Sequence, residues 1–400
     1  MFGFLCLFRR YSGLLASTRQ YLSRFLAPKS CIDYISYRFK QLYLQTNLLR
    51  HTSMKQTKNT QSRRQFLGHT ATILGAATIS PTVLGAPSII SSYNKPNSRI
   101  NGVQIGAITY SFRSMADQSA EATLKYVVDS GINAIELMGD PAETFAGRPE
   151  NPIDRRAFFQ LRRKSQNGEL TDEQKMELVE MQAKMKAHGK EVAEWRTSVS
   201  MDRFAQIKTM YQDAGVKIYG FKPSAFSQRN SDAEIDYGFR AAKTLGANHV
   251  TLEHPSDDAH TQKLGKIAAQ HKMYVAYHGH EQQTPTLWDT ALEQSEYNNL
   301  NLDLGHYVAA GNPDPRELIS AKHARISSMH LKDRQNPENG KANMPWGKGD
   351  TPIIEVLQLM RDNKYTFPAT AELEYEIPEG SDAVKELSKC LEYCRRALQA

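Results

Sequence analysis

Four short segments in the last third of the chain place possible metal ligands directly after apolar, strand-like runs. They are Tyr277–Glu281, Asn301–His306, Ser328–Asp333 and Ala371–Glu376. Their starts lie roughly 25 to 45 residues apart, which is the spacing of successive strand–helix units. A single histidine at a strand end indicates little. Imidazoles and carboxylates at the ends of successive strands indicate a metal held at one rim of a barrel.

The predicted metal ligands are His278, Asp303, His330 and Glu372. Glu374 has the same strand parity as Glu372 and is the alternative ligand at that strand end. This donor set suits a borderline-hard divalent ion, namely Mn²⁺, Co²⁺, Zn²⁺ or Mg²⁺. Such an ion can bind two neighbouring oxygens of a polyol or ketose and polarise the carbonyl, which acidifies the adjacent C–H. A nearby carboxylate or histidine can then move the proton.

Other polar residues at these strand ends are candidates for catalysis and substrate binding. The predicted catalytic residues are Glu253, His280, Lys332 and Glu374. The predicted substrate contacts are Lys222, His306 and Trp346. Each of these residues also has a purely structural interpretation. A lone histidine is often a structural hydrogen-bonding group, and Lys332 with Asp333 is compatible with a surface ion pair.

The elements that must position these residues alternate between strand and helix from Val103 onward. The predicted strands are 103–111, 134–138, 216–223, 249–254, 273–280, 300–304, 326–331 and 366–373. Eight strands separated by helices predict a (β/α)₈ TIM barrel over residues 99–400. A doubly wound sheet would favour a G-x-G-x-x-G loop after the first strand, and the sequence there is Ser111-Phe112-Arg113.

One long, charged segment, residues 141–200, interrupts this period between the second and third strands. Thr171 and Gln174 have the pattern of a capping box, which predicts a helix running to about His188. Trp195–Ser198 is a candidate for a short extra strand. The segment is either a solvated helical excursion or a lid over the barrel mouth.

The basic residues are concentrated at the N-terminus. Residues 1–64 contain 12 Lys/Arg and one acid, Asp33, whereas the rest of the chain has 38 Lys/Arg and 42 Asp/Glu. The body is therefore mildly acidic, which argues against a nucleic-acid partner. Cys390 and Cys394 are predicted to be free thiols on a packed helix, since no disulfide framework or zinc-type spacing occurs.

A possible export signal precedes the barrel. Residues 62–67 (SRRQFL) and the mildly apolar run 69–86 resemble a twin-arginine signal, although a chance Arg-Arg pair is the alternative. The run is too short and broken to span a bilayer, and no cysteine follows it for a lipid anchor. We expect translation to start at Met54, with residues 1–53 an over-extended start or unstructured leader and 54–98 the signal and linker. The predicted location is the periplasm, reached through the twin-arginine export machinery.

The strand-end motifs resemble the sugar phosphate isomerase/epimerase family, whose xylose isomerase-like TIM barrel is shared with metal-dependent AP endonucleases. The most specific motif is Asp303–His306 followed by Ala310-Gly311, and the next are Met329–Asp333 and Pro345–Gly349. The resemblance covers residues 103–398. It implies an enzyme that binds a divalent metal and acts on a carbohydrate.

The resemblance also implies the residues that would do so. A metal is implied at Asp303, His330 and Glu372, with a glutamate at the fifth strand as the remaining ligand and as acid–base partner of the eighth-strand glutamate. This chain has His278 at that place. The two-glutamate proton transfer is therefore in question, and Glu253, one strand earlier, is a candidate replacement.

Three functions are compatible with these residues. We predict an isomerase or epimerase of a sugar or sugar derivative, and a homo-oligomer is compatible with the fold. A lyase or hydrolase of keto-glycosides with the same metal-enolate chemistry is the alternative, and a non-catalytic sugar-binding barrel is the third. DNA repair is disfavoured because the second and third strands end in Met138 and Pro223, where the trinuclear zinc set of AP endonucleases needs histidines.

Overall fold

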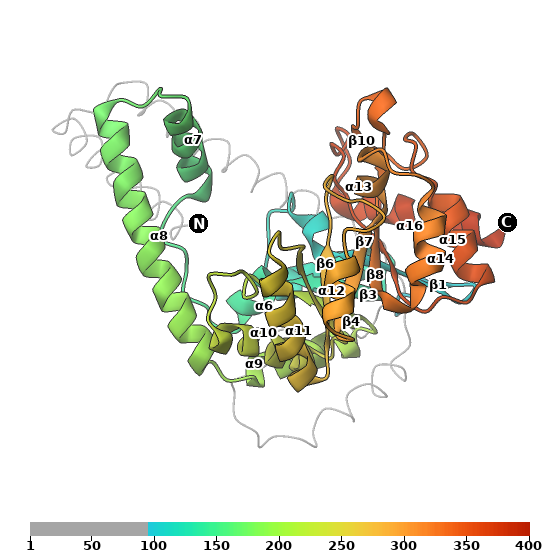
Figure 1. The fold of residues 1–400 in the computed structure, drawn as a ribbon, viewed down its shortest axis with the longest axis horizontal. Coiled ribbons are helices and arrows are strands. Elements are labelled where there is room, and N and C mark those ends of the chain that lie inside the picture. The colour runs from blue at the N-terminus through green and yellow to red at the C-terminus, as the bar shows by residue number, and fades with distance from the viewer. Residues whose placement is uncertain (1–94) are drawn as a thin grey trace, which may run out of the picture. The chain divides into compact units, whose positions relative to one another are not determined.

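Eight parallel strands close into a barrel in the computed structural model, which describes residues 95–400 (Figure 1). Each strand pairs with its neighbour in the sequence, and β11 pairs with both β8 and β2, which closes the sheet. The barrel strands are β2 (Val103–Ile108), β3 (Ala134–Met138), β4 (Lys217–Lys222), β5 (His249–Glu253), β6 (Tyr274–His278), β7 (Asn298–Asp303), β8 (Ile326–Leu331) and β11 (Ala369–Ala371). The predicted TIM barrel is confirmed. The twin-arginine motif and the Met54 start lie outside the described residues.

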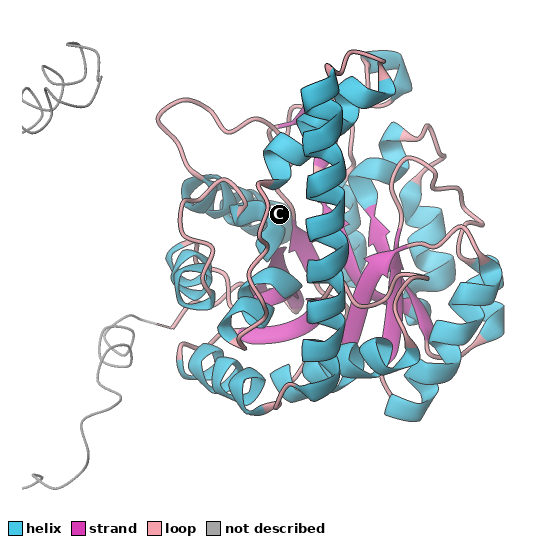
Figure 2. Cartoon of the chain, turned by 90° about the vertical axis from the view of Figure 1, so that its left-hand side faces the viewer, coloured by secondary structure: helices cyan, strands magenta, loops and turns pink. Residues whose placement is uncertain are grey.

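Helices surround the strands on the outside of the barrel (Figure 2). Each parallel strand is joined to the next by a crossover on the outer face of the sheet. The helices in these crossovers therefore bury their apolar faces against the sheet. They are α5 (Ala120–Asp129), α6 (Gly139–Phe145), α9 (Asp202–Asp213), α10 (Asp232–Leu245), α11 (Asp258–His271), α12 (Asp289–Gln294), α13 (Leu304–Ala309), α14 (Pro315–Lys322), α15 (Ile353–Asp362) and α16 (Ala383–Gln399).

The sequence sets the helix ends locally. Ser231 and Glu234 form a capping box at the start of α10, and Gly246 follows its end with φ of 87°, a conformation that a glycine adopts without strain. At the far end of the chain, Cys390 and Cys394 are buried free thiols on α16, as predicted.

Short elements complete the described structure. The strand β1 (Arg99–Ile100) adds to β2 in antiparallel orientation, and β9 (Asp333–Arg334) pairs with β10 (Asn343–Met344) in a small hairpin beyond β8. Three 3₁₀ turns are η2 (Thr109–Phe112), η3 (His323–Arg325) and η4 (Pro337–Asn339). None of the described helices is long and apolar enough to cross a membrane.

The segment between β3 and β4 contains two long helices, α7 (Arg155–Gln166) and α8 (Asp172–Ser198), which Figure 1 shows beside each other. Thr171 and Gln174 form the predicted capping box. Phe158, Leu161 and Leu178 make a small apolar cluster between the two helices that is separate from the barrel core.

The predicted extra strand at Trp195–Ser198 is wrong, because these residues form the last turn of α8. Two contacts hold this turn in helical form. The Trp195 ring packs edge-on against Tyr237 of α10 at 5.5 Å, and the buried Arg196 guanidinium bonds to Glu234 Oε1 at 3.2 Å. The end of α8 is therefore fixed to the barrel by contacts that the local sequence does not reveal.

Replacing Arg196 by Met tests this attachment. Arg196 is 6% exposed and also lies 3.5 Å from the fully buried Glu143 carboxylate. Removing one partner of a buried ion pair costs about 3 kcal/mol, so we expect the free energy of unfolding in urea to fall by about that amount. The exposed Arg163 of α7 is the matched control, for which Arg163→Met should change the value by less than about 0.5 kcal/mol. Equal effects of the two changes would contradict the assignment.

Candidate active site

The structure brings the four predicted metal ligands together at the C-terminal ends of β6, β7, β8 and β11. Ligand atoms of His278, Asp303 and His330 all lie within 4.8 Å of one another. Glu372, the first residue after β11, joins them because its Oε2 lies 3.2 Å from His330 Nδ1. All four side chains are buried. We call these four residues the ligand cluster.

Each of three cluster residues has one polar atom held by the protein and another left facing the cluster. His330 Nε2 bonds to Glu136 at 2.9 Å, which leaves Nδ1 toward Glu372. Asp303 Oδ1 accepts the backbone N–H of His306 at 2.8 Å and thereby caps α13, while Oδ2 faces the cluster and lies 2.9 Å from Lys332 Nζ. Metal ligands in proteins are oriented in this way by groups behind them.

His278 follows the same pattern through Asn301. The Asn301 amide N–H₂ donates to Ser328 at 2.7 Å and to Glu136 at 3.2 Å, so its oxygen is the atom that faces His278 Nδ1, 2.7 Å away. His278 must then donate from Nδ1 and keep a lone pair on Nε2, which lies 3.8 Å from Asp303 Oδ2. Burial lowers the pKa of His278 well below its usual value, which favours this neutral form.

Glu136 is the functional residue that the sequence reading missed. It lies inside β3, and it accepts hydrogen bonds from Thr251 at 2.6 Å and from His330 at 2.9 Å. Burial would raise its pKa, but His330, Lys222 and Thr251 together outweigh burial and lower the pKa to about 2. Burial would likewise lower the pKa of His330, yet Glu136 and Glu372 raise it to about 10. An acid within the apolar run AIELM was the only signal for this role.

Lys332 is a buried ammonium group among carboxylates. Its Nζ lies 2.9 Å from Asp303 Oδ2, 3.0 Å from Glu372 Oε2 and 2.7 Å from Glu374 Oε2. Burial would lower the pKa of Lys332, but these three carboxylates raise it, so the side chain is charged. The alternative of a Lys332–Asp333 surface ion pair is wrong, because both residues are buried and their partners differ.

Asp333 organises the loop that follows β10. Its Oδ2 accepts three backbone N–H groups, from Gly347 at 2.8 Å, Lys348 at 3.0 Å and Gly349 at 2.9 Å. Its Oδ1 accepts a fourth from Thr351 at 3.2 Å. The glycines fit this close approach, since a Cβ on Gly349 would lie 2.3 Å from Asp333 Oδ1.

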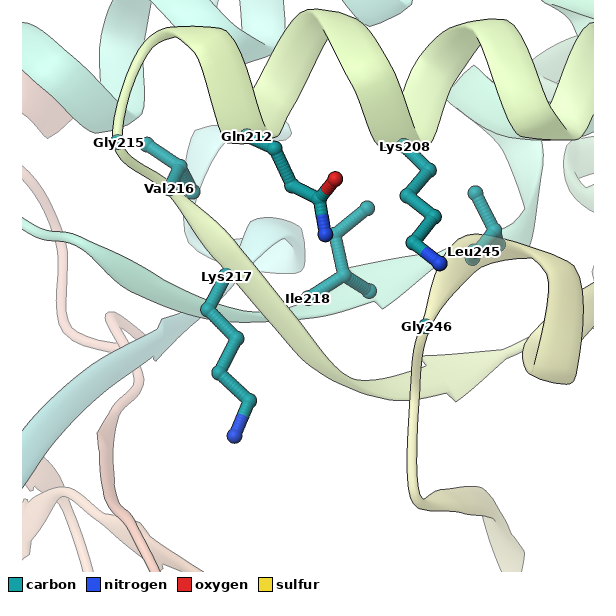
Figure 3. Close-up of a pocket in the computed structure, with 8 residues that line it drawn as sticks. All are labelled: Lys208, Gln212, Gly215, Val216, Lys217, Ile218, Leu245 and Gly246. Atoms are coloured by element: carbon teal, nitrogen blue, oxygen red, sulfur yellow. The ribbon is translucent and has the colours of Figure 1, made fainter.

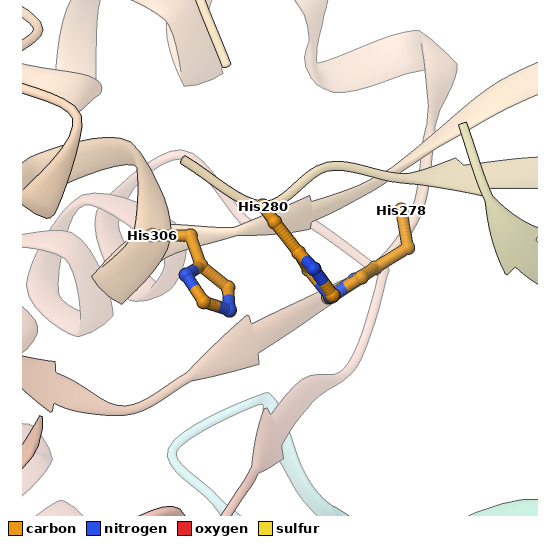
Figure 4. Close-up of side chains that lie close together, drawn as sticks. All are labelled: His278, His280 and His306. Atoms are coloured by element: carbon orange, nitrogen blue, oxygen red, sulfur yellow. The ribbon is translucent and has the colours of Figure 1, made fainter. Parts of the chain in front are cut away.

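Glu253, His280 and Lys222 form an open rim on one side of the ligand cluster. Glu253 lies 2.8 Å from Lys222 Nζ and 3.2 Å from His280 Nε2, and its side chain is 54% exposed. The His280 ring in turn packs 4.9 Å from His278 and 4.6 Å from His306 (Figure 4). Glu253 and His280 are therefore near the cluster and accessible to solvent, whereas the Lys222 side chain is only 18% exposed.

His306, on α13, lies next to His280 and also approaches Glu374 and Arg334. Its Nε2 lies 3.8 Å from Glu374 Oε2, and its Nδ1 lies 2.6 Å from Nη1 of Arg334, a residue that the sequence did not single out.

Trp346 is placed differently from the other predicted substrate contacts. Its ring packs edge-on against Tyr393 of α16, and no hydrogen bond or ring contact among the described residues joins it to the ligand cluster.

A pocket at the other end of the barrel is not part of this site. It lies where α9 ends and β4 begins, and Lys208 and Lys217 flank it (Figure 3). In TIM barrels the reacting groups lie at the opposite, C-terminal face, as the ligand cluster does.

The closed barrel with a His/Asp/Glu cluster at its C-terminal rim defines the chain as a TIM-barrel protein with a candidate metal centre. A family model described as xylose isomerase-like TIM barrel matches residues 177–394, more than half of the chain, and the chain belongs to this family. No curated protein matches it.

Solved structures resemble the chain over most of the barrel. A sugar phosphate isomerase/epimerase from Parabacteroides distasonis is 15% identical over 73% of this chain and 93% of that one, with a TM-score of 0.47. A Mycobacterium smegmatis protein of the family, in complex with magnesium, is 17% identical over 74% and 96%, with a TM-score of 0.45. The 3-keto-D-glucoside 4-epimerase of E. coli is 9% identical over 74% and 99%, with a TM-score of 0.48. At such identities the likeness concerns the fold alone.

Replacing Asp333 by Asn tests the loop anchor. The amide has one acceptor oxygen instead of two and brings its own N–H₂ toward backbone donors, so we expect about 2 kcal/mol lower stability. Amide hydrogen exchange should also become faster at Gly347–Gly349. The exposed Asp350→Asn is the control, and unchanged exchange in Asp333→Asn would contradict the role.

Proposed function

We propose that the chain is a divalent-metal-dependent isomerase or epimerase of a sugar or sugar derivative. The observation that carries the proposal is the ligand cluster, in which donor atoms of His278, Asp303 and His330 face one another while their other polar atoms are held by neighbours. Two imidazoles and two carboxylates fit Mn²⁺, Co²⁺ or Zn²⁺ well and Mg²⁺ less well. Bound there, such an ion would polarise a substrate carbonyl and make the adjacent C–H more acidic.

Charged groups beside the cluster support proton transfer. Lys332 Nζ lies 2.7 Å from the Glu374 carboxylate, which is a candidate proton acceptor. Glu253 and His280, 3.2 Å apart at the exposed rim, are a second acid–base pair. An epimerase needs both a proton acceptor and a proton donor, and we assign these roles to Glu374 and to the Glu253–His280 pair.

One feature of the site favours the second candidate, a lyase of keto-glycosides. Glu253 and His280 lie at an exposed rim, where an acid can protonate the leaving group of a substrate too large for the barrel mouth. The same deprotonation beside a carbonyl would then be followed by loss of the aglycone.

We further propose export by the twin-arginine pathway and action in the periplasm, for which the sequence motif is the support.

Metal titration of the full chain after chelator treatment tests the cofactor. We expect saturable binding of Mn²⁺, Co²⁺ or Zn²⁺ that His330→Gln abolishes. Glu136→Gln should weaken binding about 10- to 100-fold, because it removes the carboxylate behind His330. His323→Gln, at an exposed histidine in η3, is the matched control and should bind normally. Metal binding that neither His330→Gln nor Glu136→Gln weakens would rule out this site.

Proton NMR of the metal-loaded protein with candidate sugars in D₂O distinguishes the two reactions. Solvent deuterium in an otherwise intact sugar is expected for an epimerase, since the abstracted proton is replaced from solvent. A released aglycone with an unsaturated keto sugar would indicate the lyase instead. Neither product with a panel of sugars and keto-glycosides would contradict both, and sugar binding retained by His330→Gln would then favour a binding protein.

A further inference from the structure

His306 has two ring nitrogens, and the structure determines which of them carries the proton. We propose that Arg334 is a positioning residue that holds His306 as the Nε2–H tautomer, so that His306 donates a hydrogen bond to a neutral oxygen of the substrate rather than binding metal. The substrate part of this inference rests on the proposed function, whereas the tautomer does not.

The donor–acceptor geometry carries the first step. Arg334 Nη1 lies 2.6 Å from His306 Nδ1. A guanidinium group can only donate hydrogen bonds, so His306 Nδ1 must accept. A proton on Nδ1 would set two donors against each other at this distance. The single proton of the neutral ring is therefore on Nε2.

Arg334 cannot easily turn away from His306. Its Nη2 donates to Glu281 Oε1 at 2.8 Å and to the Lys341 carbonyl at 2.5 Å, and its backbone N–H donates to Thr351 at 3.0 Å. The side chain passes close to α13, where a Cβ on Gly305 would lie 3.1 Å from Arg334 Cγ. The guanidinium is thus held by two hydrogen bonds from Nη2 in addition to its contact with the imidazole.

The tautomer decides between two possible metal sites. His278, His280 and His306 also have ligand atoms within 4.8 Å of one another (Figure 4). In His306, however, the Nδ1 lone pair is engaged by Arg334 and Nε2 bears a hydrogen, so neither nitrogen is free to coordinate. The three-histidine set consequently lacks a third ligand. In the ligand cluster, His330 can lose its Nδ1 proton on coordination while Glu136 keeps the proton on Nε2, so that set has its third ligand.

The proton on Nε2 has no hydrogen-bond acceptor among the described residues, so a ligand oxygen can take that place. The nearby Glu374 Oε2 lies 3.8 Å from His306 Nε2, which is longer than a hydrogen bond. The His280 ring lies 4.6 Å from the His306 ring. A hydroxyl or carbonyl oxygen of a sugar can accept from Nε2–H here, whereas a cation would meet the hydrogen.

The tautomer can be read directly by two-bond ¹H–¹⁵N correlation NMR on the full chain labelled with ¹⁵N-histidine. The His306 signals are assigned by their loss in His306→Gln. We expect the Nε2–H pattern in the wild-type protein at neutral pH, both without metal and with Zn²⁺ bound. An Nδ1–H or doubly protonated His306 in the wild type would overturn the proposal without any variant.

Variants test the part played by Arg334. Arg334→Met should shift His306 toward a tautomer mixture, and Arg334→Lys, which restores a donor, should return it toward Nε2–H. Glu281→Gln is the matched control, because it leaves Nη1 in place and should keep the tautomer. An unchanged Nε2–H pattern in a folded Arg334→Met protein would show that Arg334 does not set it.

Metal and substrate readouts separate this inference from the proposed function. His306→Gln should leave Zn²⁺ affinity within about 2-fold of wild type, and a loss of 10-fold or more would make His306 a ligand and refute the inference. With an active substrate, Arg334→Met should raise KM about 10-fold, the loss of roughly one hydrogen bond to an oriented donor, while metal affinity stays unchanged. The Nε2–H pattern in a protein that turns over no sugar would support the tautomer and contradict the proposed function.

Discussion

The hydrogen bond between His330 Nε2 and the Glu136 carboxylate is the interaction on which the site depends. Both side chains are fully buried, so neither can exchange its partner for water, and an unpaired charge there would be costly. The bond joins β3 to β8 across the barrel interior. Glu136 also accepts from Asn301, which fixes the amide of Asn301 and through it the ring of His278. One carboxylate therefore orients two of the four ligand-cluster residues.

The sequence was sufficient to predict the barrel and most of the ligand cluster, because both depend on short-range patterns in the chain. Strand–helix alternation specifies a closed parallel sheet, and residues at the C-terminal ends of its strands must meet at one rim. His278, Asp303, His330 and Glu372 each end or follow a strand, so their meeting followed from parity and position.

The residues that escaped prediction act through partners far away in the chain. Glu136 is 194 residues from His330 and sits in mid-strand, where an acid has no local reason to be. Arg334 reaches His306 only because the β9–β10 hairpin folds over the start of α13. Trp195 and Arg196 have only weak intrinsic preferences for helix or strand. Their contacts with Tyr237 and Glu234 stabilise the helical conformation. Periodicity contains none of this information.

The charge balance of the interior explains why a metal suits this site. Four carboxylates, those of Glu136, Asp303, Glu372 and Glu374, surround two cations, His330 and Lys332. Lys222 and Glu253 offset each other at the rim and do not alter this balance. With these groups ionised, the six side chains therefore carry a net charge of −2 (four negative and two positive charges).

A divalent ion offsets that charge, but His330 must give up its proton to coordinate. Metal affinity should consequently rise with pH as long as Glu136 holds His330 protonated in the metal-free protein. Lys332 competes in the same way, because its ammonium occupies the space between Asp303 and Glu372. The buried cations thus offset part of the carboxylate charge in the metal-free barrel, and they also compete with a metal for the same carboxylates.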